Sequence, residues 1–72
     1  MVYVKVTGEQ SEELERVSRQ AVGRVALRAQ MVLLSGRGYS VGQIAEIHGC
    51  GEDVVRQWLH RYEQQGVEGL ED

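Results

Sequence analysis

Proline and phenylalanine are absent from this chain of 72 residues, and cysteine occurs once, at Cys50. A single cysteine excludes an internal disulfide and suits a reducing compartment. No apolar run approaches membrane-spanning length, and residues 1–6 are too short for the apolar core of a signal peptide. We therefore expect a soluble, cytoplasmic protein with no membrane partner.

The chain also lacks the basic balance that is typical of nucleic-acid-binding domains, since its net charge is −3 at pH 7. Part of the acidic excess lies in residues 66–72, which contain three acidic residues and no basic one. Residues 21–49 contain three arginines and one glutamate, a net charge of +2. A local basic face is therefore compatible with the sequence.

The spacing of apolar residues predicts one short strand followed by four helices. Val2, Val4 and Val6 alternate with Tyr3 and Lys5, as in a β-strand. Helical spacing is found over 8–19, 21–35, 41–48 and 52–65. The expected fold is all-α: a single domain over 1–72, built as a small bundle of about four helices with a short N-terminal β-strand at 1–6.

Local signals mark the ends of these helices. Thr7 with Gln10, and Ser40 with Gln43, have the spacing of a capping box, in which side chain and backbone satisfy each other's free groups. Residues 36–38, Gly-Arg-Gly, are expected to end the second helix with a left-handed glycine, and Gly66 to end the fourth. The apolar stripe of the second helix includes Leu27, which we expect to face the bundle.

The third and fourth predicted helices have the spacing of a helix-turn-helix. Ala45 is small where the next helix crosses it, and Gly49 supplies the positive φ of the turn. Four residues are expected to fill the wedge between the helices: Ile44, Cys50, Val55 and Trp58. The side chains then left outward, where a recognition helix enters the major groove, are Glu52, Asp53, Arg56, Gln57, His60 and Arg61.

Arg37 and Ser40 complete the predicted set of DNA contacts. Arg24 and Arg28 are either phosphate contacts or ordinary surface arginines. Trp58 and Tyr62 share the helical spacing of Val55, which favours core positions over base stacking. His48, Cys50 and His60 lack the paired spacing of a zinc site, so we expect no metal and no other cofactor. We also expect no enzyme active site and no small-molecule substrate.

Residues 27–34 (LRAQMVLL), 38–45 (GYSVGQIA), Gly49 and 55–58 (VRQW) resemble the N-terminal domain of mariner-like bacterial insertion-sequence transposases. The segment 66–70 (GVEGL) is similar to the one that follows the recognition helix in that family. The resemblance implies a homeodomain-like module that binds terminal inverted repeats, with 52–65 in the major groove, and a separate metal-dependent catalytic domain downstream.

The sequence departs from that family at two places. Glu52 and Asp53 stand where the family has basic residues, and Glu71 and Asp72 replace a basic extension. These departures keep a second interpretation open: a protein-interaction or dimerisation module whose DNA surface has decayed. The valine alternation at 2–6 has no partner strand in the chain, which predicts a homodimer paired through two antiparallel N-terminal strands.

Overall fold

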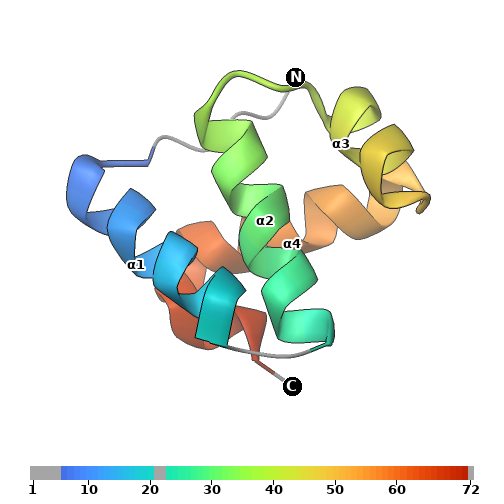
Figure 1. Cartoon of the computed structure of the whole chain (residues 1–72). Coiled ribbons are helices and arrows are strands. Elements are labelled where there is room, and N and C mark those ends of the chain that lie inside the picture. Colours follow the sequence, from blue (N-terminus) through green and yellow to red (C-terminus); the bar gives the residue numbers. More distant parts are fainter. Residues whose placement is uncertain (1–5, 21–22, 72) are drawn as a thin grey trace.

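The computed structural model describes residues 6–20 and 23–71, which form four α-helices and one 3-10 helix (Figure 1). Their bounds are α1 Gly8–Gln20, α2 Arg24–Gly36, α3 Val41–His48, α4 Glu52–Gln65 and η1 Gly66–Leu70. The described residues contain no strand. Val6 packs against the core outside any strand, and the rest of the strand predicted at 1–6 lies outside the described residues.

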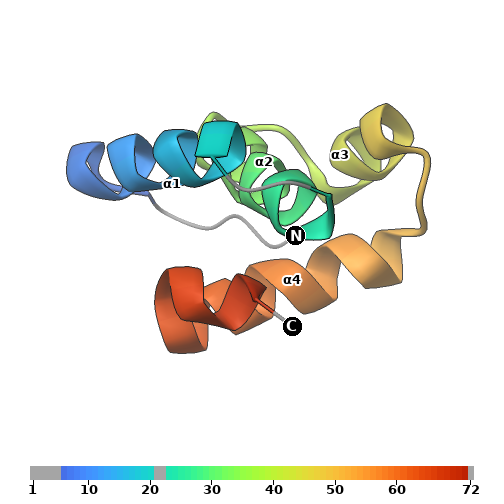
Figure 2. The same cartoon turned by 60° about the horizontal axis from the view of Figure 1, so that its bottom comes forward.

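The helices form two layers. Helices α1 and α2 lie side by side, with α3 beyond α2, and α4 crosses beneath them (Figures 1 and 2). The 3-10 helix η1 folds back along α4, and it also contacts α2. This arrangement leaves one face of α4 directed away from the rest of the molecule, as Figure 2 shows.

One apolar core joins all of these elements. The largest side chains that are completely buried come from every helix: Leu14, Val32, Ile44, Val55, Leu59 and Leu70. In α4 the buried residues Val55, Leu59 and Tyr62 recur at helical spacing, which turns a single stripe inward. Burying a side chain of this size contributes about 1.5 to 3 kcal/mol, so the six anchor the bundle.

Both predicted capping boxes are present. The Thr7 N–H donates to Gln10 Oε1 at 3.0 Å, and the Gln10 N–H donates to Thr7 Oγ1 at 3.2 Å. The same reciprocal pair joins Ser40 and Gln43 at 2.9 and 3.1 Å. The predicted bounds of α3 and α4 agree with the structure. The Ser40 cap and Gly49 define the two ends of α3 locally, and Gly51 and Gly66 flank α4.

The second helix differs from its predicted range, 21–35. It runs from Arg24 to Gly36, one residue past the predicted end, and the glycine-containing segment 36–38 ends it as expected. The left-handed conformation belongs to Gly38, with φ 96°. The Tyr39 N–H donates back to the Leu34 carbonyl at 3.1 Å, which closes the turn one residue later than expected.

Two other features also differ from the sequence prediction. Leu27, expected to face the bundle, is 47% exposed because α4 crosses α2 beside it and leaves its side chain at the surface. The segment 66–70, for which no element was expected, is a 3-10 helix that buries Leu70 completely. Gly69 makes this possible, since an added Cβ would lie 2.7 Å from the Arg61 carbonyl oxygen.

Candidate nucleic-acid interface

The turn between α3 and α4 has the geometry of a helix-turn-helix. Gly49 ends α3 in the left-handed conformation, with φ 64° and ψ 35°. The Cys50 N–H donates to the Ala45 carbonyl at 3.0 Å, so the chain reverses within three residues before α4 begins. Ala45 is buried beneath the crossing helices, as its small size predicted, and Cys50 is half-buried in the wedge. The turn therefore holds α4 at a fixed angle to α3.

The outer face of α4 is polar. Asp53, Arg56, Gln57 and His60 are exposed, as the inward stripe of the helix requires. Arg61, also expected to be exposed, is instead half-buried. Its guanidinium carbon lies 5.1 Å from the centroid of the Trp58 ring. Trp58 itself is partly buried and packs against the core, so its predicted core position holds only in part.

A family model described as a homeodomain-like domain matches residues 22–71, which include α2, α3, α4 and η1. The chain belongs to the homeodomain-like family. No curated protein and no solved structure matches it. In this homeodomain-like domain α3 and α4 form the helix-turn-helix, and α1 lies outside the matched segment and packs against α2.

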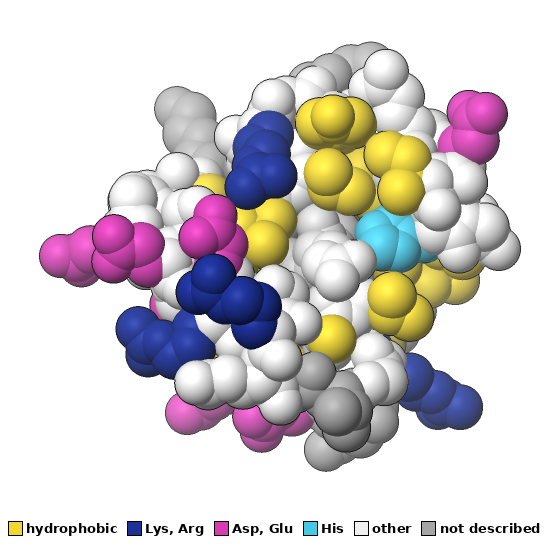
Figure 3. Space-filling view, viewed as in Figure 1, with side chains coloured by type: hydrophobic (Ala, Val, Ile, Leu, Met, Phe, Trp, Pro, Cys, Tyr) yellow, Lys and Arg dark blue, Asp and Glu magenta, His cyan; other side chains and the backbone are white. Residues whose placement is uncertain are grey.

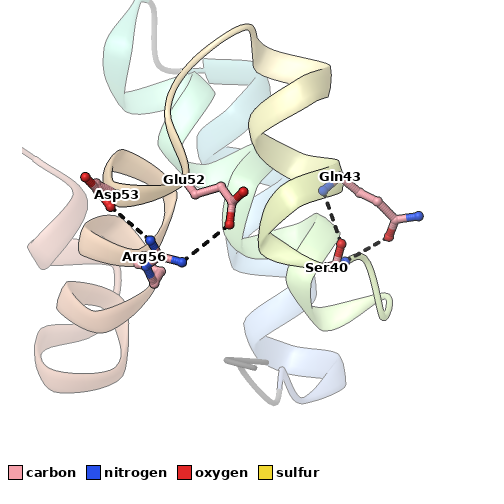
Figure 4. Close-up of polar contacts among 5 residues, drawn as sticks. All are labelled: Ser40, Gln43, Glu52, Asp53 and Arg56. Atoms are coloured by element: carbon pink, nitrogen blue, oxygen red, sulfur yellow. Dashed lines mark hydrogen bonds and ion pairs between the residues drawn. The ribbon is translucent and has the colours of Figure 1, made fainter.

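The acidic start of α4 is compensated within the homeodomain-like domain. Arg56 Nη2 lies 2.9 Å from Asp53 Oδ1, and Arg56 Nη1 lies 3.5 Å from Glu52 Oε1 (Figure 4). The three side chains are exposed, so each ion pair contributes only about 0.3 to 0.5 kcal/mol. The two carboxylates therefore offset the charge of Arg56, and breaking these ion pairs costs little.

Glu52 also reaches toward the first turn of α3. An added Cβ at Gly42 would lie 3.8 Å from Glu52 Oε2, which places this carboxylate near the N-terminal end of α3, where the helix dipole favours negative charge (Figure 4). Ser40, predicted as a DNA contact, lies in the same turn with its hydroxyl oxygen accepting from Gln43. The N-terminal end of α3, which includes Ser40, therefore lies close to Glu52 at the start of α4.

Arg37 lies away from the exposed face of α4. Its Nη2 pairs with Glu15 Oε1 at 3.3 Å, which ties the end of α2 to α1. It also lines a shallow hollow with Tyr39 and Gln43, beside the start of α3. The ion pair of Arg37 with Glu15 is exposed and therefore weak, and a role of Arg37 as a DNA contact stays a prediction.

Arg28 is a structural residue that sequence reasoning missed. It is buried, with 7% of its surface exposed, and its Nη1 donates to the Leu70 carbonyl at 2.9 Å. Its guanidinium also lies over the Trp58 ring. The interpretation of Arg28 as a surface or phosphate-contacting arginine is therefore wrong, because its charge is used inside the fold. Arg24, one turn earlier, is exposed.

The remaining polar groups do not gather into a site. Among the described residues, no three His, Cys, Asp or Glu side chains are placed to hold a metal ion. Over the same residues, no helix is long and apolar enough to cross a membrane. His48 Nε2 is buried without a hydrogen-bond partner in the described part of the chain.

Proposed function

We propose that this homeodomain-like chain binds double-stranded DNA and that α4 enters the major groove. The observation that carries the proposal is the exposed polar face of α4, presented by a helix-turn-helix whose opposite face is locked into the core. Gln57 can pair with adenine, and Arg56 with guanine. Because α4 is held by Val55 and Leu59, these side chains are presented on a rigid element.

A titration of fluorescently labelled random duplex, followed by anisotropy at about 50 and about 200 mM salt, tests the proposal. Phosphate contacts release counterions, so the affinity should fall steeply between the two concentrations. The double substitution Arg56→Ala and Arg61→Ala should remove binding and leave the helical circular-dichroism signal unchanged. Arg16→Ala with Arg19→Ala, exposed on α1, is the control with the same change of charge. Equal affinity of the two double variants would refute the assignment.

The finer proposal is a module of the kind that binds the inverted repeats of a transposase. It is supported by the sequence resemblance to the transposase family over residues 27–70. In that family the helix that corresponds to α4 binds DNA. A selection of binding sites from randomised duplexes tests it: a recovered consensus should be short, as a single recognition helix reads only a few base pairs. Recovery of no consensus leaves sequence-independent duplex binding as the function.

We further propose that the chain acts as a homodimer through its N-terminal segment. Two copies would present two copies of α4, and paired half-sites strengthen weak modules. The support is the valine alternation at 2–6, most of which lies outside the described residues. Sedimentation of the full chain against a chain without residues 1–6 tests it. A monomeric full chain, or a truncated chain that dimerises equally well, contradicts the proposal.

A protein-interaction role is the second candidate, and an apolar surface favours it. Ile47 is 56% exposed and lines a groove between α2 and α3 with Leu33, Leu34 and His48. Figure 3 shows apolar side chains gathered around a histidine on the face where α2 and α3 lie in front of α4. This face is separate from the exposed face of α4, so a partner bound there would leave the recognition helix accessible.

A further inference from the structure

A second groove lies between α2 and α4, along one flank of the recognition helix. It is lined by Arg24, Leu27, Arg28, Met31, Val54 and Trp58. Two of these are apolar side chains with large exposed fractions, 47% for Leu27 and 40% for Val54. Exposed apolar groups beside arginines form a surface that suits a ligand with both apolar and anionic parts.

The charge on this flank is basic. Among the described residues, no acidic side chain lines the groove and Arg24 has no ion-pair partner. Arg61 adds a further cation to this flank, since its guanidinium lies over the Trp58 ring, which lines the groove. Val54, Trp58 and Arg61 are spaced by four and three residues, so they form one continuous stripe along α4.

The opposite flank of α4 has a different character. Glu52, Arg56 and Glu63 follow one another along it, and Arg56 is paired with the carboxylates of Glu52 and Asp53. Within the described part of the chain, one flank therefore offers Arg24 and Arg61 without an ion pair, next to apolar surface, and the other offers an arginine whose charge is paired. Because the two flanks differ, a polyanion placed along α4 would be attracted to the side of Arg24 and Arg61.

The dimensions of DNA bring a sugar-phosphate strand to each flank. An α-helix with its side chains is about 10 to 12 Å wide, close to the about 12 Å width of the major groove. A helix in the groove therefore has one strand along each side. Along each DNA strand, charged phosphates alternate with less polar deoxyribose rings. The groove offers arginines next to apolar side chains, which suits such a strand.

We propose that the groove between α2 and α4 binds one sugar-phosphate strand of duplex DNA, an inference that rests on the proposed function. Arg24 and Arg61 contact phosphates, and Leu27 with Val54 pack against the deoxyribose between them. The groove also sets the orientation of α4 on the duplex: the Arg24 side lies close to its strand, and the carboxylates of Glu52 and Asp53 lie farther from phosphate.

Two matched pairs of single substitutions test the groove, using the full chain and a random duplex in the anisotropy assay. Arg24→Ala is compared with Arg16→Ala on α1, which removes the same charge from another face. Leu27→Glu is compared with Gln30→Glu, which adds the same charge to α2 beside the other groove. All four positions are exposed, so the fold should be retained, and circular dichroism checks this.

The expected result for Arg24→Ala is several-fold weaker binding at low salt and a salt slope reduced by about 0.9, the value for one lost phosphate contact. Arg16→Ala should leave the slope unchanged. Leu27→Glu should weaken binding more than Gln30→Glu, because its carboxylate would stand against the strand. Either pair behaving alike, in a chain that binds duplex, overturns the inference and leaves the proposed function intact. Absence of salt-dependent duplex binding by the unsubstituted chain overturns both.

Discussion

The guanidinium carbon of Arg28 lies 3.8 Å from the centroid of the Trp58 ring, and the same guanidinium donates to the Leu70 carbonyl at 2.9 Å. These two contacts join α2, α4 and η1 at the edge of the core. A buried cation is stabilised when ring and carbonyl oxygen both face it, and both contacts strengthen as water is excluded. Arg28 therefore fixes the position of α4 from beneath its exposed face.

Replacing Arg28 with alanine should reduce the free energy of unfolding by about 2 to 4 kcal/mol. The reason is the loss of a charge-assisted hydrogen bond, worth about 1.5 to 3 kcal/mol, together with a partly desolvated cation–π contact. Urea unfolding followed by the fluorescence of Trp58, the single tryptophan, measures the change. Arg16→Ala, at an exposed position, should change stability by less than about 0.5 kcal/mol. Equal stability of the two variants would show that Arg28 has no structural role.

Gly69→Ala should destabilise the domain by about 1 to 3 kcal/mol, the usual cost of overpacking. The added methyl group would meet the backbone carbonyl oxygen of Arg61 at 2.7 Å and Gln65 Cβ at 3.0 Å, so η1 would have to move away from α4. Urea unfolding again gives the value. Gly8→Ala is the control, since nothing lies within 4 Å of an added Cβ there. A Gly69 variant as stable as the Gly8 variant would contradict the close packing of η1.

Stability should decline at alkaline pH through Tyr62. Burial raises the pKa of this phenol above its ordinary value of 10.0, and the negative charge of Glu13 raises it further. The folded chain then holds the proton more tightly than the unfolded chain. The contribution is therefore complete below pH 10.0 and is lost as the pH rises through the folded-state pKa.

Unfolding of Tyr62→Phe and Tyr39→Phe as a function of pH checks this linkage. Tyr62→Phe should lack part of the alkaline decline, while Tyr39→Phe, which changes an exposed side chain, should retain it. Spectrophotometric titration of the phenols gives a second readout, in which Tyr62→Phe removes a phenol whose pKa is raised. An alkaline decline of the same size in both variants would argue against a role for Tyr62.

Glu52→Gln with Asp53→Asn should strengthen binding to random duplex and make it more salt-dependent. The substitutions release Arg56 from both ion pairs and remove carboxylates that phosphates repel. Anisotropy at two salt concentrations measures the gain. Glu9→Gln with Glu12→Gln on α1 makes the same change of net charge at a distance from α4. An equal gain in the two double variants would mean that only net charge matters and that the start of α4 does not face DNA.

Local signals in the sequence were sufficient for the helix-turn-helix. Capping boxes and a left-handed glycine act over three or four residues, so they define α3 and the turn at Gly49 without reference to the rest of the chain. The inward stripe of α4 likewise follows from helical spacing. The predicted DNA contacts on its outer face are exposed as expected, except for the half-buried Arg61, and their role stays a prediction.

Long-range packing set the features that the sequence did not reveal. Arg28 finds its acceptor 42 residues away at Leu70, and an arginine within an apolar stripe carries no local sign of burial. The exposure of Leu27 depends on where α4 crosses α2, which helical spacing cannot show. The two glycines of 66–70 were the one sequence signal for η1. A glycine is required at position 69 because the Arg61 carbonyl oxygen leaves no room for a Cβ, and this contact forms only when η1 packs on α4.

Amide NMR spectra of the isotope-labelled chain, titrated with random duplex, test the central claim most directly. If α4 lies in the major groove, the largest shift changes should fall on its exposed residues, with Gln57 and His60 foremost, and on the start of α3. Amides of α1 around Glu12 should change least. Shifts concentrated on α1 or around Ile47, with α4 unaffected at saturation, would contradict the account.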